Sequence, residues 1–247
     1  MVLWWGGPGE GAGSQVPESV RVNLHGHSHL SDGELAPGDL AERLAAAGVR
    51  AAALTDHDTI EGLAAFREAL TRKGAGVVSG VELTVLDPEV GERHVLGYGF
   101  DPANKALREF LARSPANKRP SYLQALSSAF ERSRSSGEKS EPSGVRAGAG
   151  LPGAAEAIRV LHDAGGLAVL AHPVVPGRTP DLAALERLLV RWKAWGLDGL
   201  EAYYSGYSED LSRELVSLAG RLGLLVSAGT DYHGAGLPSS TDLAVDI

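Results

Sequence analysis

Cysteine is absent from the 247-residue sequence. Its absence excludes disulfides, thiolate metal sites and cysteine nucleophiles, and leaves His, Asp and Glu as the strong metal ligands of the chain. No apolar run is long enough to cross a bilayer, and the first residues lack the basic and apolar regions of a signal peptide. We therefore expect a cytoplasmic protein with no membrane partner, in which residues 1–20 form a flexible N-terminal tail.

An excess of basic residues is also missing. The formal net charge is −8, whereas affinity for duplex nucleic acid comes mainly from Lys and Arg side chains that neutralise phosphates. This balance argues against a broad nucleic-acid-binding surface. It remains compatible with a small phosphorylated substrate or the end of a short single strand, provided that bound metal ions supply local positive charge.

Short β-branched runs alternate with amphipathic helical stretches along most of the chain, which is typical of an α/β fold with a largely parallel sheet. Seven such runs are present, enough for a barrel, and a single α/β barrel commonly has roughly 250 residues. Two helices are well marked, one starting at Pro37 and ending at Gly48, the other with Ser208 as its N-cap. We expect one domain over residues 21–247, with 101–150 as an inserted helical or mobile lid.

Metal-ligand side chains occur almost only where the predicted strands end. In parallel α/β barrels the C-terminal strand ends converge on one face, so residues distant in sequence meet there. The two histidines of the HxH phrase also share one strand face, because they are two residues apart. The strand-end candidates are His25, His27, His57, Glu82, His172, Asp231 and His233.

His94 begins a predicted strand instead of ending one. The segment VELTVLDPEVGERHVL is typical of a hairpin with DPEVG at its tip. A turn centred near Pro88 would set Glu82 opposite His94 in an antiparallel pair. The hairpin thereby adds His94 to the predicted cluster.

Six phrases of the sequence resemble the PHP (polymerase and histidinol phosphatase) family of metal-dependent phosphoesterases, most closely its stand-alone nucleotide and RNA phosphoesterase branch. They are LHGHSHLSDG, LTDHDTIEGL, GVEL, HVLGY, AGGLAVLAHP and GTDYHG. The resemblance implies a distorted seven-stranded (β/α)7 TIM-like barrel and two to three divalent metal ions. Nine residues match the family's ligand positions: His25, His27, Asp32, His57, Glu82, His94, His172, Asp231 and His233.

The resemblance also implies how these ligands are shared. The first ion would take His25, His27, Glu82 and Asp231; the second Glu82, His94 and His172; and the third Asp32, His57 and His233. Imidazole and carboxylate ligands suit manganese, iron or zinc, among which residue types do not choose. The implied reaction is hydrolysis of a phosphate ester by a hydroxide that bridges two ions. The candidate catalytic residues are His57, Asp231 and His233.

Residues near these motifs have alternative interpretations. Arg119 and Arg178 are candidates for binding a substrate phosphate, with a solvated surface as the favoured alternative. Asp56 and Asp58 either orient His57 or cap a helix that starts near Thr59.

Other polar and aromatic residues are ambiguous for different reasons. His29 is equally compatible with a surface loop and with proton donation to the leaving group, a role for which His233 and a metal-bound water are the other candidates. We interpret His162 as structural, and Trp192 and Trp195 as helix packing. Asn23 stands where the family commonly has an Asp just before the LHxH phrase. We expect this difference to alter the hydrogen bonds behind the metal ligands and not the ligand set itself.

Three functions remain open from the sequence. The leading hypothesis is a hydrolase that removes phosphate from a nucleotide or trims a short nucleic-acid end. A small-metabolite phosphatase, such as a histidinol phosphatase, is the second. A catalytically silent PHP module that binds a partner is the third, although silent versions would be expected to lose ligands and all nine ligand positions are filled here. No obligate protein partner is evident.

Overall fold

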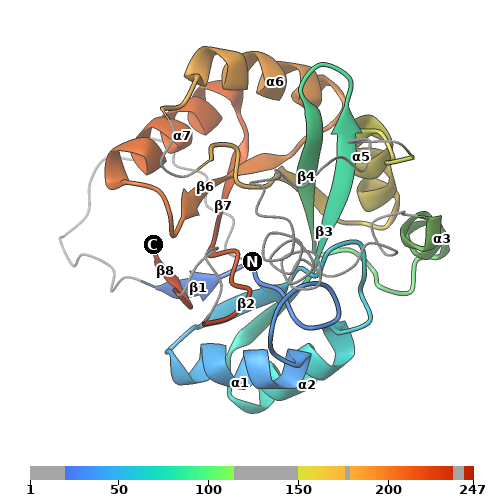
Figure 1. The fold of residues 1–247 in the computed structure, drawn as a ribbon, viewed down its shortest axis with the longest axis vertical. Helices are drawn as coiled ribbons and strands as arrows, with labels where there is room; N and C mark the ends of the chain where they lie inside the picture. Colours follow the sequence, from blue (N-terminus) through green and yellow to red (C-terminus); the bar gives the residue numbers. More distant parts are fainter. Residues whose placement is uncertain (1–19, 114–149, 176–178, 236–241) are drawn as a thin grey trace, which may run out of the picture.

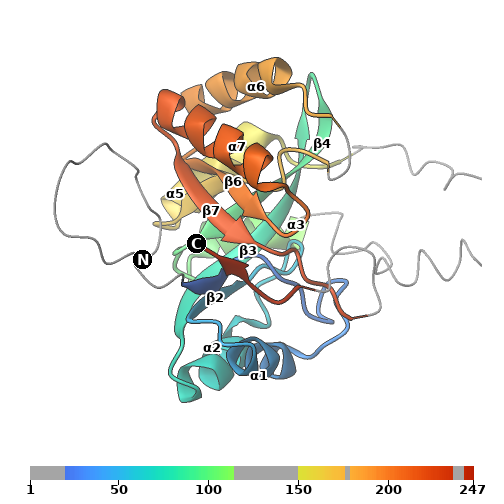
Figure 2. The same cartoon turned by 90° about the vertical axis from the view of Figure 1, so that its left-hand side faces the viewer.

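The structure is a computed structural model that describes residues 20–113, 150–175, 179–235 and 242–247. Helices surround a strongly curved sheet, with α1 and α2 on one side and α6 and α7 on the opposite side (Figure 1, Figure 2). The elements are β1 (Arg21–Asn23), α1 (Pro37–Ala46), β2 (Ala51–Leu54), α2 (Leu63–Arg72), β3 (Gly76–Asp87), β4 (Gly91–Tyr98), α3 (Lys105–Arg113), α5 (Ala154–Asp163), β5 (Leu167–Leu170), α6 (Leu182–Ala194), β6 (Gly199–Tyr204), α7 (Glu209–Leu222), β7 (Leu225–Gly229) and β8 (Val245–Asp246).

The sheet has eight strands in the order β7-β6-β5-β4-β3-β2-β1-β8. Strands β1, β2 and β3 run parallel to one another, as do β5, β6 and β7, whereas β4 is antiparallel to both of its neighbours. The ends of the sheet meet just beyond β1, where the amide of Leu24 donates to the carbonyl of Ala228 at 3.0 Å and that of His27 to Tyr232 at 2.8 Å. The result is an α/β fold with a nearly closed, barrel-like sheet.

The prediction of seven strands was wrong by one strand. All seven predicted runs form strands, and the two-residue strand β8 adds an eighth by pairing antiparallel with β1. A strand of two residues is too short to produce a hydrophobic period, so no pattern of hydrophobic residues predicts it.

Helix boundaries follow the expected capping chemistry in part. Helix α7 begins after Ser208, whose side chain accepts a hydrogen bond from the amide of Leu211, and it ends at Gly223 with a left-handed φ of 61°. Helix α1 begins at Pro37 as predicted but ends at Ala46. Helix α2 begins only at Leu63, so the predicted helix start near Thr59 was wrong.

The β3–β4 hairpin forms with a different register from the predicted one. Glu82 pairs with Leu96, Thr84 pairs with His94, and the turn is centred on Glu89. The predicted pairing of Glu82 with His94 was therefore wrong by two residues. Since side chains alternate with a period of two, this error leaves His94 on the same face as Glu82.

The hydrophobic core has a large part between sheet and helices and a small part inside the barrel. The small part consists of Leu24, Ala53, Leu96, Tyr98, Val169 and Ala171, with Val78 packed against it. In the large part, Trp192 is fully buried and its ring lies 6.1 Å from that of Trp195, which confirms helix packing for this pair. Apolar side chains thus fill the barrel, and the polar residues gather beyond the strand ends.

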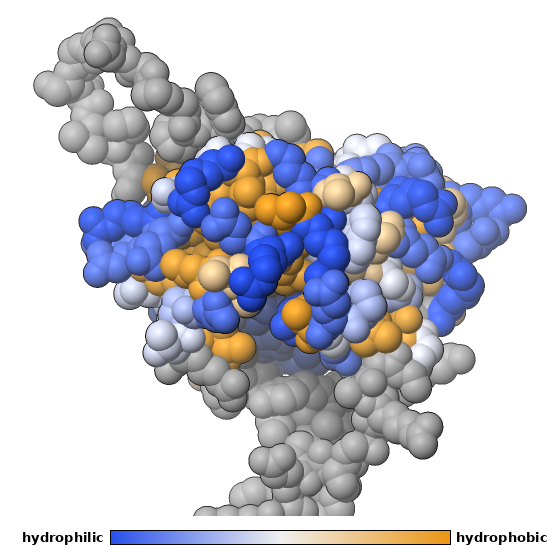
Figure 3. All heavy atoms as spheres, turned by 90° about the horizontal axis from the view of Figure 1, so that it is seen from above, coloured by the Kyte–Doolittle hydropathy of each residue, from blue (hydrophilic) through white to orange (hydrophobic). Residues whose placement is uncertain are grey.

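The described surface carries hydrophilic residues with hydrophobic ones scattered among them, as the view onto α6 and the hairpin shows (Figure 3). No helix among the described residues is long and apolar enough to span a membrane. The predicted N-terminal tail lies almost wholly outside the described residues, and so do Arg119 and Arg178. Of the predicted lid, the structure describes residues 101–113, which include α3, and residue 150.

Candidate metal centre

The carboxylate of Glu82 is the centre of the polar cluster. It lies on β3, and its side chain is fully buried. Its Oε2 lies 3.1 Å from Nε2 of both His25 and His27. Its Oε1 lies 3.0 Å from Nδ1 of His94 and 3.1 Å from Nε2 of His172. Four imidazoles from three separate parts of the chain therefore share one carboxylate.

Asp231 adds a second carboxylate to this group. Its Oδ1 lies 3.2 Å from Nε2 of His25 and 3.0 Å from Nε2 of His27. One potential ligand atom from each of these residues and from Glu82 falls within 4.8 Å of the others. These four residues are the set that the sequence resemblance implies for a first ion.

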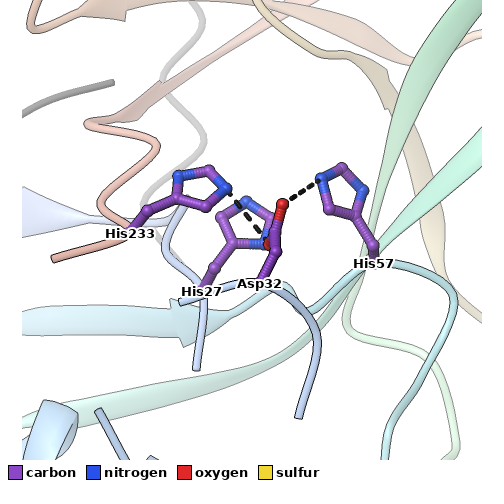
Figure 4. Close-up of side chains that lie close together, drawn as sticks. All are labelled: His27, Asp32, His57 and His233. Carbon is purple, nitrogen blue, oxygen red and sulfur yellow. Dashed lines mark ion pairs between the residues drawn. The ribbon is translucent and has the colours of Figure 1, made fainter. Parts of the chain in front are cut away.

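Asp32 gathers a further set of ligand atoms (Figure 4). Its Oδ1 lies 3.2 Å from Nε2 of His233, and its Oδ2 lies 3.8 Å from Nε2 of His57. The structure adds His27 to this group, since its Nδ1 lies 3.6 Å from Asp32 Oδ1. The set implied for a third ion is thus assembled, with one histidine more than expected.

The remaining set forms around the hairpin. Ligand atoms of Glu82, His94 and His57 lie within 4.8 Å of one another. His172 approaches the same place, with its Nε2 3.3 Å from Nδ1 of His94. The structure therefore brings all nine predicted residues into one cup at the C-terminal end of the barrel, and places His57 between two of the groups.

Two histidines are held in the tautomer that a metal ligand needs. Nδ1 of His25 lies 3.1 Å from Oε1 of Glu201, and Nδ1 of His233 donates to the backbone carbonyl of Asp231 at 2.8 Å. A proton on Nδ1 leaves the lone pair of Nε2 free, and in both residues Nε2 faces a carboxylate of the cup. Hydrogen bonds of this kind orient metal-binding imidazoles.

Glu201 is a functional residue that the sequence analysis missed. It is fully buried on β6, contacts His25, and its Oε2 accepts a hydrogen bond from the amide of His172 at 2.8 Å. A single acid in the otherwise apolar strand GLEAYY was the signal that could have revealed it.

Unsatisfied buried atoms test whether the cup suits metal ions. Nε2 of His27, Nδ1 of His57 and Oδ1 of Asp231 are all buried and have no hydrogen-bond partner. Buried polar atoms normally have one, and a site that binds a metal ion is a standard reason for an exception. All three atoms belong to residues of the predicted ligand set, so the cup fits divalent cations.

The backbone around the cup is strained. Three non-glycine residues among those described have positive φ, namely Asp58 at 51°, His172 at 24° and Asp231 at 53°. Such conformations persist where the surrounding structure imposes them, and they are frequent at active sites. Space is also restricted, because a Cβ on Gly229 would lie 2.3 Å from Cβ of His25 and 2.6 Å from Oε1 of Glu201.

Burial and neighbouring charges set the pKa values of the imidazoles in the metal-free cup. Burial disfavours the charged form of His27, but Asp231 and Glu82 outweigh it and raise its pKa to about 10. The pKa of His94 also rises to about 10, because Glu82 and Glu92 outweigh burial. Burial lowers the pKa of His57 to about 3, since the attraction of Glu82 is offset by its neighbours His27 and His94.

The carboxylates of the cup stay ionised in spite of their surroundings. Burial by itself would raise the pKa of Glu82, but the charges of His25, His57 and His94 hold it well below its usual value. The pKa values of Asp32 and Asp231 are lowered in the same way by the surrounding imidazoles. Three ionised carboxylates in one cup provide the negative charge that binding of several cations requires.

The acids beside His57 bond to other partners. Oδ1 of Asp56 accepts from the amide of Ser28 at 2.6 Å and from the hydroxyl of Ser31 at 2.8 Å. Oδ1 of Asp58 accepts from the amide of Thr84 at 3.1 Å. Both predicted roles, orienting His57 and capping a helix, were wrong. Asp56 instead holds the loop after the HxH phrase, and Asp58 ties the end of β2 to β3.

Other residues of the first motif have structural bonds. The amide of Asn23 donates to the hydroxyl of Thr230 at 2.9 Å, so it joins β1 to the end of β7 behind the metal ligands. His29 is exposed, and its Nδ1 lies 3.2 Å from the carbonyl of Leu35. Nε2 of His162 lies 2.8 Å from Oδ2 of Asp198, away from the cup, which agrees with the structural role predicted for it.

Comparisons with known proteins agree with this geometry. The PHP domain family matches residues 23–134. A 5'-3' exoribonuclease of Haemophilus influenzae is 31% identical over 86% of this chain and 90% of its own length. A 3',5'-nucleoside bisphosphate phosphatase of Chromobacterium violaceum is 30% identical over 88% of each chain. The structure of a C. violaceum amidohydrolase with bound sulfate superposes with a TM-score of 0.74 and 27% identity, over 92% of this chain and 91% of that one.

The fold and the site define a metal-dependent hydrolase of phosphoric esters. More particularly, the chain belongs to the PHP domain family of phosphoesterases.

Proposed function

We propose that the protein hydrolyses phosphate esters of nucleotides or of short single-stranded nucleic-acid ends, with two to three divalent ions of manganese, iron or zinc in the cup. The observation that carries this proposal is the convergence of nine ligand side chains, with the buried carboxylate of Glu82 among them, in one cup. The names of the two sequence relatives, an exoribonuclease and a nucleoside bisphosphate phosphatase, support the substrate class.

Three sets of residues would hold the ions. His25, His27, Glu82 and Asp231 form the first set, Glu82, His94 and His172 the second, and Asp32, His57 and His233 the third. Each set is supported by contacts between its members. Bound divalent ions supply two kinds of chemistry, activation of water as a nucleophile and stabilisation of negative charge on phosphoryl oxygens.

The side chains of the cup position the substrate and exclude bulk water, and none of them is proposed as the nucleophile. His25 and His27 are fully buried, so the inner end of the cup is closed to bulk water, whereas the side chains of His57, His94 and His172 remain 22–29% exposed. We infer that the substrate phosphate enters from the side of these three histidines. Asp231 is held in turn by Tyr204, whose hydroxyl donates to its Oδ2 at 3.1 Å.

Neither of the two predicted histidines is well placed to donate a proton to the leaving group. Both ring nitrogens of His233 have partners, because Nδ1 bonds to a carbonyl and Nε2 faces Asp32. Its proposed role is therefore that of a ligand. His29 is free to reach solvent from its exposed loop, but it bonds to Leu35 rather than pointing at the cup. A water molecule remains the simplest proton donor.

The function is tested by phosphate release from a panel of substrates. Purified protein is stripped with a chelator, reloaded with manganese, and given nucleoside bisphosphates, short oligonucleotides and histidinol phosphate. We expect release from the first two only with metal. Preferential turnover of histidinol phosphate would support the metabolite phosphatase instead, and absence of both bound metal and turnover would support a silent module.

The variant His57→Ala tests whether the cup is the catalytic site. His57 lies between two groups of ligand atoms, so its loss should abolish most turnover while circular dichroism and the melting temperature stay close to wild type. His162→Ala is the matched control, since His162 lies outside the cup and contacts Asp198. Full activity of the His57 variant would contradict the assignment.

A further inference from the structure

Asp32 is placed by a loop, whereas neighbouring ligands of the cup are placed by the sheet. The amide of His27 donates to the carbonyl of Tyr232 at 2.8 Å, which continues the pairing of strands beyond β1. The amide of Asp231 donates to the carbonyl of His25 at 2.9 Å in the same region. Asp32 lies in the loop between β1 and α1, so whatever holds this loop decides where its carboxylate lies.

The loop folds tightly back onto the HxH phrase. The amides of Ser31 and Gly33 donate to the carbonyl of Ser28 at 3.1 and 2.9 Å. A Cβ on Gly33 would lie 2.2 Å from the carbonyl oxygen of His27, so the turn accepts only glycine there. Asp32 occupies this turn, between two residues whose amides are both bonded.

The carboxylate of Asp56 holds the loop from behind. Asp56 follows β2 and is only 1% exposed. Its Oδ1 accepts from the amide of Ser28 at 2.6 Å and from the hydroxyl of Ser31 at 2.8 Å, and its Oδ2 accepts from the hydroxyl of Ser28 at 2.7 Å. A buried carboxylate is costly unless it is hydrogen-bonded, and here the donors belong to the loop that carries Asp32.

Ser31 connects Asp56 with Asp32. Its Oγ lies 2.8 Å from Oδ1 of Asp56 and 3.2 Å from Oδ1 of Asp32. A hydroxyl has one proton to donate, and the shorter contact favours donation to Asp56. Oδ1 of Asp32 then keeps its lone pairs for the cup, where it lies 3.2 Å from Nε2 of His233.

The same loop and the same acid also fix the two imidazoles that accompany Asp32. His57 directly follows Asp56 in the chain, so the backbone of Asp56 places His57 while its carboxylate places the loop. The amide of Glu34, at the far end of the loop, donates to the carbonyl of His233 at 2.7 Å. Asp56 and the loop thus bring together one set of ligands, Asp32, His57 and His233.

We propose that Asp56, acting through Ser28 and Ser31, is the positioning residue for this one set of ligands. Asp56 controls the binding of the ion at Asp32, His57 and His233, and has little influence on the ions at Glu82. The inference rests on the proposed function and adds which residue governs one of its ion sites.

The test measures stepwise manganese affinities of chelator-treated protein by competition with a chromophoric chelator. For Ser31→Ala and for Asp56→Asn we expect one binding step to weaken by about 10–100-fold, the usual cost of losing a residue that orients a metal ligand. The other steps should change by less than about twofold. Ser31→Thr keeps the hydroxyl and should restore wild-type affinities.

Two variants outside the cup serve as matched controls. Asp198→Asn changes an acid that accepts from the amide of Ala168 at 2.8 Å, and Ser79→Ala removes a hydroxyl that donates to the carbonyl of Phe100 at 2.8 Å. Both should leave every binding step unchanged. Melting temperatures of all variants show whether they are folded, and Ser31→Ala, at a partly exposed position, keeps the test valid if Asp56→Asn does not fold.

A double-mutant cycle identifies the affected step. Asp32→Asn removes a ligand of the set, so adding Ser31→Ala to it should weaken manganese binding no further. Ser31→Ala combined with Glu201→Gln should show both losses in full, because Glu201 orients His25 in another set.

Turnover provides a separate readout. The manganese concentration for half-maximal phosphate release should rise by the same factor as the weakened step, and kcat at saturating manganese should return to within about twofold of wild type. A merely structural role of Asp56 or Ser31 would lower kcat without moving the manganese dependence.

The outcomes separate the two claims. Equal weakening of all steps, no weakening, or full addition of the Ser31→Ala and Asp32→Asn effects would overturn the role of Asp56 and leave the phosphoesterase intact. If wild-type protein binds manganese but hydrolyses no phosphate ester, the proposed function fails, and the titrations still decide the role of Asp56. If wild-type protein binds no manganese, both claims fail.

Discussion

Two buried polar clusters occupy opposite ends of the β3–β4 hairpin and differ in how well their atoms are satisfied. At the tip, Oδ1 of Asp87 accepts from the amides of Glu89 and Val90 and from Arg191, and Oδ2 accepts from Arg191 and from Nε1 of Trp192 at 2.7 Å. Among the described residues of this cluster, Nε of Arg191 is the one buried side-chain atom without a hydrogen-bond partner.

At the other end of the hairpin, Glu82 lies among imidazoles and near the unsatisfied atoms of His27, His57 and Asp231. The fully bonded carboxylate of Asp87 fixes the hairpin to α6 and needs no ligand. The cup keeps donor atoms crowded and unbonded, which is costly unless something binds them. Hydrogen-bond satisfaction thus distinguishes a structural cluster from a binding cluster on the same strands.

The largest expected effect is that of Glu82→Gln, which removes the charge at the centre of the cup. Substitution of residues behind metal ligands typically costs 10–100-fold in metal affinity or activity, so loss of a shared ligand should exceed about 100-fold. Phosphate release and metal content by mass spectrometry give the measurement. Glu68→Gln, an exposed acid on α2, is the control, and wild-type metal content in the Glu82 variant would contradict the comparison.

The next effect is on stability, at the other end of the hairpin. Asp87→Ala leaves the guanidinium of Arg191 and the indole of Trp192 without their acceptor, and breaking a buried pair costs about 3 kcal/mol of unfolding free energy. Arg191 is partly exposed, so the cost should fall at or below this value. Chemical denaturation measures it. Metal content at saturating ion should stay near wild type; a selective loss of metal with unchanged stability would contradict the structural role.

Glu201→Gln changes a residue that does not belong to the predicted ligand set but contacts the predicted ligand His25. It keeps the size of the side chain but weakens its hold on Nδ1 of His25, and we expect a loss of about 10–100-fold in metal affinity. A competition titration with a chromophoric chelator measures this, and excess metal should restore most of the activity. If excess metal does not restore it, Glu201 acts otherwise than by orienting His25.

The last prediction concerns the pH dependence of stability in metal-free protein. The pKa values of His27 and His94 rise from 6.5 to about 10 on folding, so their stabilisation is fully present below pH 6.5 and is lost as the pH rises towards 10. Chelated protein should therefore melt at progressively lower temperature between these limits.

The same melting experiment on metal-loaded protein provides the comparison. Metal displaces the protons from its ligands, so the loaded protein should show a weaker dependence on pH in the same window and should release protons on loading. Melting curves and calorimetry in buffers of different ionisation enthalpy check both statements. Identical pH profiles with and without metal would count against ion binding at these histidines.

Much of the site could be predicted because its residues lie at strand ends. The HxH phrase and the acid of GVEL are local signals, and a barrel brings such ends together whatever the details of the loops. The prediction of the site does not depend on the exact hairpin register, since a register error of two residues still left His94 on the same face of the sheet as Glu82. Glu201 was missed because one acid in an apolar strand has no spacing partner, and its role depends on a neighbour 176 positions away.

The sequence by itself determined the α/β class, the seven principal strands and the identity of the clustered residues, because hydrophobic period and ligand chemistry are properties of short segments. Only the tertiary structure decided which atoms face one another: the tautomers set by Glu201 and by the Asp231 carbonyl, the separate bonds of Asp56 and Asp58, and the short strand β8. These features depend on distances between segments remote along the chain, and such distances are set by how sheet and helices pack.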